Sequence, residues 1–167
     1  MREATQLDWD PRVVAYDHPD AVALVAAVQQ VYLHRYGQND ITPVAAGEFS
    51  APAGLFLVGY SDGAPVACGG WRFRAATGED PVLRDGDVEL KRMYVVDGMR
   101  GRGLARRLLA ELERHAAAAG ARRIVLETGP RQPEAIQLYR TSGYHELGRF
   151  GAYRDHPLSR CFAKPLP

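Results

Sequence analysis

Hydrophobic residues recur along this chain with two different periods, which predicts a mixture of helices and strands. Between residues 21 and 36, apolar side chains return every three or four positions, as on a helix with one buried face, and Asp20 can cap its start. The same spacing predicts a second helix between residues 103 and 120, where arginines lie mostly off the leucine stripe. Pro133 can open a third, short helix that ends near Gly143.

Shorter stretches that are rich in β-branched and aromatic residues predict strands. Asp62-Gly63, between the first two stretches, favours a tight hairpin turn. The predicted strands are residues 54–60, 65–73, 88–96, 124–128, 144–150 and 160–164. Since strands and helices alternate over much of the chain, we predict an α+β fold in which helices cover a mixed sheet.

Length, composition and charge narrow the class of protein. A chain of 167 residues, 46% of them hydrophobic, can bury one full core, so we expect a single domain over residues 1–167. The formal net charge of +1 gives no field that would attract nucleic acid or a membrane surface, and we expect neither as a partner. The N-terminus has no apolar core of a secretion signal, and no apolar run is long enough to span a bilayer.

The two cysteines, Cys68 and Cys161, lie far apart in the sequence and do not have the spacing of metal ligands. They also do not form the disulfide framework that is typical of small secreted proteins. We therefore expect inert packing thiols, no metal, and a cytoplasmic protein.

A basic turn that contains two glycines precedes the second predicted helix. Gly101 and Gly103 let the backbone approach a ligand closely, and the free N–H groups at a helix start favour an anion. Arg100, Arg102 and Arg106 add charged donors for phosphate oxygens. The spacing fits neither the dinucleotide-binding glycine motif nor a Walker A loop, which disfavours a nucleotide-dependent dehydrogenase or kinase. Taken alone, the turn is either a pyrophosphate site or a solvated surface turn.

The segment from residue 93 to residue 105 resembles a known signature. Met93-Tyr94-Val95, followed by Arg100-x-x-Gly103-x-Ala105, is similar to the Arg/Gln-x-x-Gly-x-Gly/Ala motif of the GNAT superfamily of N-acetyltransferases. Ala105 is an accepted variant at the last small position. The resemblance favours the pyrophosphate interpretation of the turn.

The resemblance is strong over residues 88–143 and implies the GNAT fold, a central mixed and mostly antiparallel β-sheet flanked by helices. It also implies acetyl-CoA as co-substrate, with the pantetheine arm along residues 93–95 and the pyrophosphate in the turn 100–106. The implied cofactor-binding residues are Met93, Tyr94, Val95, Arg100, Gly101, Arg102, Gly103, Leu104, Ala105 and Arg106.

A second motif supplies a candidate general acid. Ala135, Leu138, Tyr139 and Gly143 match the family pattern Asn-x-x-Ala-x-x-Leu-Tyr-x-x-x-Gly-Phe/Tyr, whereas Gln132 stands at the position of the Asn. When an amine attacks a thioester, a thiolate leaves, and a nearby phenol can donate a hydrogen bond or a proton to it. Tyr139 is the residue that the resemblance places in this role. The alternative is that Tyr139 is a core tyrosine.

The attacking amine must also lose a proton, so a base within reach is expected. Strand alternation would put Glu89, Lys91 and Met93 on one face, so that Glu89 faces the same cleft as the pantetheine-binding segment. In family relatives an acidic residue near this point often serves as the base. The alternative is that Glu89 forms an ion pair with Lys91 or Arg92. Glu127, at the end of the next strand, is the second candidate.

The remaining polar residues give weaker indications. His34, Tyr32, Tyr36 and Tyr153 are candidate substrate contacts, because the resemblance places the first three before a loop that walls the acceptor pocket. His115, on an arginine-rich helix, is expected to be solvated.

The motifs together imply an acetyl-CoA-dependent N-acetyltransferase that transfers the acetyl group directly to a primary amine of a small molecule or peptide. A non-catalytic acyl-CoA-binding sensor or interaction module is the alternative from a different class. Homodimers are common among such proteins, although no feature of this sequence requires one. Because acceptor pockets are built from loops, the sequence carries no transferable code for the amine.

Overall fold

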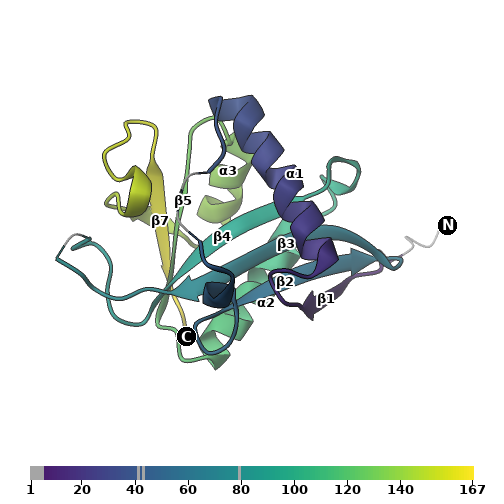
Figure 1. Cartoon of the computed structure of the whole chain (residues 1–167), viewed down its shortest axis with the longest axis horizontal. Helices are drawn as coiled ribbons and strands as arrows, with labels where there is room; N and C mark the ends of the chain where they lie inside the picture. Colours follow the sequence, from purple (N-terminus) through teal and green to yellow (C-terminus); the bar gives the residue numbers. More distant parts are fainter. Residues whose placement is uncertain (1–5, 41, 43, 79) are drawn as a thin grey trace.

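The computed structural model describes residues 6–167 except 41, 43 and 79, and within these residues the chain forms one seven-stranded sheet (Figure 1). The strands are β1 (Asp10–Val13), β2 (Gly54–Ser61), β3 (Ala64–Phe73), β4 (Asp87–Val95), β5 (Arg123–Thr128), β6 (His145–Leu147) and β7 (Arg160–Pro165). Their order is β1-β2-β3-β4-β5-β7-β6, and β4–β5 is the parallel pair in an otherwise antiparallel sheet. The predicted α+β fold with a mixed, mostly antiparallel sheet is confirmed.

Helices cover both faces of this sheet. They are α1 (Pro19–Tyr36), α2 (Leu104–Ala118) and α3 (Pro133–Thr141), with short 3-10 turns η1 (Ala46–Phe49), η2 (Asp97–Met99) and η3 (Gly151–Tyr153). In Figure 1, α1 crosses the front of the sheet, and α2 lies behind it. We call these two sides the α1 face and the α2 face.

Each face has its own apolar core. On the α2 face, the buried leucines of α2 pack against Leu90 of β4 and Leu126 of β5, and Tyr139 of α3 joins the same cluster. On the α1 face, Leu24 packs with Phe56 and other residues of the central strands. Full burial of one such side chain stabilises the fold by about 1.5–3 kcal/mol. Because residues of β4 and β5 belong to these cores, the packing holds both strands in place.

Two local predictions need correction, and one strand was not predicted. His18 rather than Asp20 caps α1, because its Nδ1 accepts the Asp20 N–H at 3.1 Å, while the Asp20 carboxylate accepts a hydrogen bond from the Tyr60 hydroxyl at 2.6 Å. The predicted strand 144–150 is shorter, since β6 covers 145–147. The sequence pattern also missed β1, a four-residue strand that begins beside Pro11 at the sheet edge.

A bulge in β4 changes which side chains share a face. Gly70 pairs with Lys91 and Cys68 pairs with Tyr94, so Arg92 and Met93 lie opposite the single residue Gly69, and Arg92 takes a positive φ of 62°. Strict alternation would have put Lys91 and Met93 on one face. That prediction was wrong: Met93 packs in the core of the α2 face, whereas Lys91 and Arg92 both bond to Asp40, beyond the end of α1.

β4 and β5 then separate. Their parallel pairing covers Asp87–Glu89 and Arg123–Val125 and goes no further. Beyond Glu89, no described strand pairs with the edge of β4 that faces β5, and the two strands diverge. The opening between them is the position of the candidate site.

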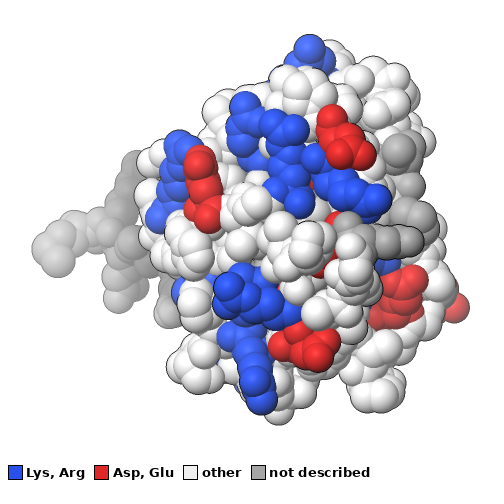
Figure 2. Space-filling view, turned by 90° about the vertical axis from the view of Figure 1, so that its left-hand side faces the viewer, with Lys and Arg blue, Asp and Glu red and all other residues white. Residues whose placement is uncertain are grey.

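The outer surface and the helices give two further observations. On the face at the left of Figure 1, basic and acidic side chains are interspersed and do not form a field of one sign (Figure 2). Across the part of the chain that the structure describes, no helix has both the length and the apolar character to cross a membrane.

Candidate active site

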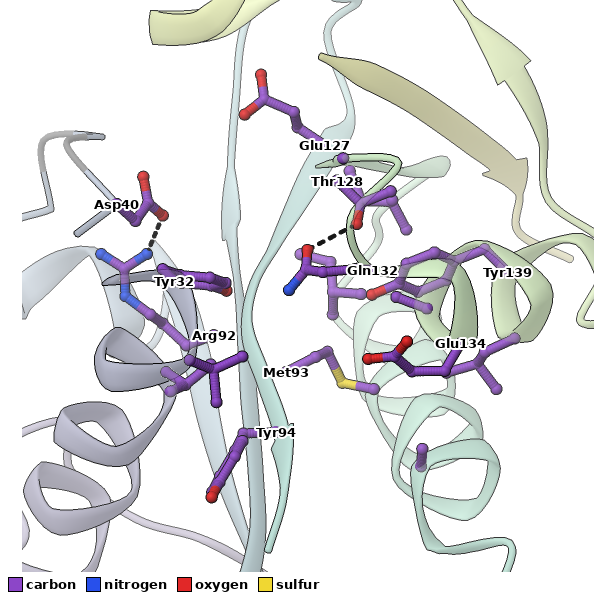
Figure 3. Close-up of a pocket in the computed structure, with 18 of the residues that line it drawn as sticks. Tyr32, Asp40, Arg92, Met93, Tyr94, Glu127, Thr128, Gln132, Glu134 and Tyr139 are labelled. Carbon is purple, nitrogen blue, oxygen red and sulfur yellow. Dashed lines mark hydrogen bonds and ion pairs between the residues drawn. The ribbon is translucent and has the colours of Figure 1, made fainter. Parts of the chain in front are cut away.

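A cavity of about 650 Å³ lies between the diverging ends of β4 and β5 (Figure 3). Residues 90–95 of β4 and 126–128 of β5 line it, together with the end of α1, the turn before α2, and the loop around residues 153–159. Tyr32 of α1 and Tyr139 of α3 point toward one another across the opening in Figure 3. The cavity therefore has one end at the turn before α2 and another near the end of α1.

The turn before α2 has the backbone geometry of an anion-binding helix start. Gly101 and Gly103 adopt positive φ values of 75° and 78°, and Gly103 is the N-cap of α2, which begins at Leu104. The first N–H groups of a helix have no intrahelical acceptor, and the helix dipole favours a negative charge at this end. A phosphate group fits this turn.

Two arginines fix the turn to its surroundings. Arg100 Nε donates to the Val95 carbonyl at 3.2 Å, and its guanidinium lies 5.9 Å from the centre of the Tyr94 ring. Arg106 donates to the hydroxyls of Ser142 and Thr141 at 3.0 and 2.7 Å, which ties α2 to the end of α3.

Most of the predicted cofactor-binding residues line the cavity. They are Met93, Tyr94, Val95, Arg100, Gly101, Gly103, Leu104, Ala105 and Arg106. Arg102 is the exception, because its side chain is exposed and does not line the cavity.

Tyr139 is both a core residue and a cavity residue. Its ring is buried against Tyr144 and Phe162, with centroids 5.6 and 6.3 Å away, and its hydroxyl points toward the gap between β4 and β5 (Figure 3). Burial raises the pKa of Tyr139 above its ordinary value. The phenol therefore stays protonated and can donate. The two interpretations of this residue, core packing and hydrogen-bond donation, are compatible.

Glu89 does not face the cavity. It lies where β4 still pairs with β5, so there is no opening beside it, and its side chain is 4% exposed. One carboxylate oxygen accepts hydrogen bonds from Arg72 at 3.0 and 2.9 Å and from Arg74 at 2.7 Å. The prediction that Glu89 shares a cleft with Met93 was wrong. Glu89 forms ion pairs, but its partners are Arg72 on β3 and Arg74 just beyond its end, rather than the predicted Lys91 or Arg92.

Glu127 lines the cavity instead, at the end of β5. Burial raises the pKa of Glu127 to about 7, although the nearby Lys91 charge and a hydrogen bond from Ser159 act in the opposite direction. Ser159 Oγ donates to Glu127 Oε2 at 3.1 Å. A carboxyl group with a pKa near neutrality is suited to accept a proton at physiological pH. The second candidate from the sequence therefore has the better position.

Gln132 forms a further part of the cavity wall. Thr128 Oγ1 donates to Gln132 Oε1 at 3.0 Å (Figure 3). Gln132 is also the residue just before α3. Although it replaces the family's Asn, it lines the cavity.

The end of the cavity near α1 holds three largely buried charges that the sequence pattern did not connect. Lys91 Nζ donates to Asp40 Oδ2 at 2.9 Å, and the Arg92 guanidinium bonds to the same oxygen. The bulge in β4 brings the two cations to one face, and no sequence pattern marked it. Of the predicted substrate contacts, Tyr32, Tyr36 and Tyr153 line the cavity, whereas His34 does not.

Two other groups of residues lie outside the cavity. Cys68 and Cys161 are buried, and neither lines it. His115 is an outer residue of α2 that pairs with Glu111 at 3.8 Å. Within the described residues, no group of three or more His, Cys, Asp or Glu side chains could hold a metal ion.

Comparisons with known proteins agree with this geometry. The model of the Acetyltransferase (GNAT) family matches residues 6–144. An IAA acetyltransferase of Azospirillum brasilense is 35% identical over 159 residues, which cover 92% of this chain and 97% of that protein.

Solved structures show the same fold. A Klebsiella pneumoniae protein assigned as an acyl-CoA N-acyltransferase superimposes with a TM-score of 0.75 at 29% identity, covering 95% of this chain and 98% of the other. The PaiA N-acetyltransferase of Thermoplasma acidophilum, solved in complex with coenzyme A, superimposes with a TM-score of 0.69 at 14% identity, covering 95% of this chain and 99% of the other.

Proposed function

Because this chain belongs to the GNAT acetyltransferase family, we propose that it transfers the acetyl group of acetyl-CoA directly to a primary amine of a small molecule or peptide. One observation carries the proposal: a single cavity joins the helix-start turn at Gly103 to the hydroxyl of Tyr139 and the carboxylate of Glu127. The turn suits the phosphates of the donor, and the two side chains suit the proton transfers of acyl transfer.

The donor end of the cavity fits a coenzyme A molecule. The turn from Gly101 to Ala105 would hold the pyrophosphate through backbone N–H groups, with Arg100 and Arg106 adjacent. The unpaired edge of β4 at residues 93–95 offers backbone N–H and C=O groups to the amides of the pantetheine arm. When bound, acetyl-CoA supplies an activated thioester.

Two side chains would then move protons. Glu127 accepts a proton from the incoming ammonium, directly or through water, so that the free amine can attack. Tyr139 donates a hydrogen bond or proton to the thiolate that leaves. In Figure 3, Glu127 extends away from Tyr139, which suits a base and an acid that act on opposite sides of the reacting carbon.

The cysteines support direct transfer rather than an acyl-enzyme. A cysteine nucleophile must be a thiolate that the thioester can reach. Burial raises the pKa of Cys161 to about 11 and of Cys68 to about 12, and neither thiol lines the cavity.

Thiol release tests this function. Acetyl-, propionyl- and succinyl-CoA are screened against amines, amino acids, polyamines, aminoglycosides and peptides, and free coenzyme A is followed with a thiol reagent. We expect amine-dependent release with acetyl-CoA. Tight coenzyme A binding without release for any acceptor would instead support an acyl-CoA-binding sensor.

A further inference from the structure

Lys91, Arg92 and Asp40 form a charged cluster at the cavity end near α1, and within this cluster positive charges outnumber negative ones. Lys91, Arg92 and Asp40 have side chains that are 9%, 4% and 11% exposed. Two cations therefore share one carboxylate in a largely buried place. A charge held out of water without a partner is costly, so such a site favours a ligand that brings the missing negative charge.

Asp40 has no capacity left for an ammonium group. Its Oδ2 accepts from Lys91 and Arg92, while its Oδ1 accepts from the Thr42 N–H at 2.9 Å and from the Tyr153 hydroxyl at 3.1 Å. A carboxylate has about four acceptor positions, and these four bonds fill them. The two cations also keep the pKa of Asp40 well below its usual range, so it is neither a base nor a free anion.

Lys91 does have unused capacity. An ammonium group has three N–H donors, and within the described part of the chain Asp40 is the one acceptor bonded to Lys91. Lys91 also lines the cavity. Arg92 Nε is buried without a hydrogen-bond partner among the described residues, so donors exceed acceptors at this end.

We propose that the acceptor is a small amino carboxylate, such as a free amino acid, whose carboxylate binds Lys91 while its amine faces Glu127. This inference rests on the proposed function, which it narrows. Lys91 and Glu127 line the same cavity, and the charge of Lys91 acts to lower the pKa of Glu127, so the two ends of a compact molecule can reach both groups. The ring of Tyr32 and the side chain of Leu158 line the same space and suit an apolar side chain.

Matched substrates test the carboxylate. Each proteinogenic amino acid is compared with its carboxamide and its decarboxylated amine by thiol release, with rates expressed per free amine. We expect kcat/KM to be about 100-fold higher for the best acid than for its two neutral counterparts, because only the acid brings a second anion to the two cations that share Asp40. Equal or faster turnover of the neutral amines would overturn the amino carboxylate proposal and leave the acetyltransferase function standing.

Variants at Lys91 test the residue. In Lys91→Met, the preference for acid over carboxamide should fall from about 100-fold to within about threefold, and Lys91→Arg should recover most of it. Arg114→Gln, which removes an exposed charge on α2, should leave the preference unchanged. An unchanged preference in Lys91→Met would exclude Lys91 as the anchor.

Calorimetry distinguishes a failure of the amino carboxylate proposal from a failure of the acetyltransferase proposal, and it does not depend on the variants. Amino acid and carboxamide are titrated into wild-type protein saturated with coenzyme A. Binding of the acid and not of the amide supports the site even if the variant does not fold or no amine is acetylated. Equal affinity, or no binding of either, counts against it.

Discussion

Ser159, just before β7, donates a hydrogen bond from Oγ to Glu127 Oε2 at 3.1 Å. The residue that precedes a neighbouring strand thus orients the carboxylate that we propose as base and stabilises its ionised form. Burial acts in the opposite direction and is the larger influence, so that the pKa of Glu127 is raised to about 7. The balance between these two effects makes the pH dependence of the enzyme a direct test of the mechanism.

Glu127→Gln should remove the base. Since the ionised carboxyl is the active form, wild-type kcat/KM should fall with pH below about 7, approaching about tenfold per pH unit. In the variant this inflection should vanish, and kcat at pH 8 should drop about 100-fold. Steady-state kinetics over about two pH units on either side of the expected inflection, with rates corrected for the fraction of acceptor present as free amine, would check this. A retained inflection would rule out Glu127.

Ser159→Ala should move the inflection without abolishing activity. Loss of a hydrogen bond to a charged group removes about 1.5 kcal/mol from the ionised form, so the inflection should rise by about one pH unit. Activity well above the inflection should stay near wild type. Superimposable pH profiles for wild type and variant would show that the hydroxyl does not influence the base.

Tyr139→Phe should slow acyl transfer while the ring packing remains. Removal of a positioned acid is expected to lower kcat by about 100-fold, with little change in KM for acetyl-CoA. Tyr144→Phe is the matched control, because that neighbouring phenol donates to Glu113 at 3.5 Å and does not line the cavity. Comparable losses in both variants would indicate a packing effect rather than proton donation.

The sequence predicted the residues at the cavity end beside the turn before α2 better than those at the end near α1. The glycine turn and α2 are local features, since spacing and helix-start chemistry depend on neighbouring residues, and nine of the ten predicted cofactor-binding residues line the cavity. Arg102 differs because the direction of one side chain in a turn depends on backbone angles that no motif encodes.

The orientation of Glu89 was mispredicted for a reason that lies in β4. Alternation assumes an uninterrupted strand, but the bulge at Arg92 separates the face of Glu89 from that of Met93. The cavity also opens only beyond the last residue that pairs with β5, a property of two strands far apart in sequence. The cluster of Asp40 with Lys91 depends on the same long-range arrangement.

Gly103→Ala should weaken donor binding. At φ 78° an added Cβ costs about 1–2 kcal/mol, either as lost stability or as a shifted turn. We expect a KM for acetyl-CoA raised by about tenfold with the amine KM little changed. Gly98→Ala is the control, because a Cβ there meets no atom within 4 Å and its φ is not in the left-handed region. Equal effects in the two variants would argue against the turn as the phosphate site.

Glu89→Gln distinguishes a structural carboxylate from a catalytic one. The variant removes the anion that Arg72 and Arg74 share, although Arg72 keeps Glu48 and Arg74 keeps Asp80, so the free energy of unfolding should fall by about 1–3 kcal/mol. Because Glu89 does not line the cavity, the protein that remains folded should keep the wild-type inflection near pH 7. Urea denaturation and the pH profile, measured on the same preparation at low temperature, give both quantities. Full stability together with a lost inflection would return the role of base to Glu89. A carboxylate that only holds two arginines in place should not affect the pH dependence of proton removal from the amine.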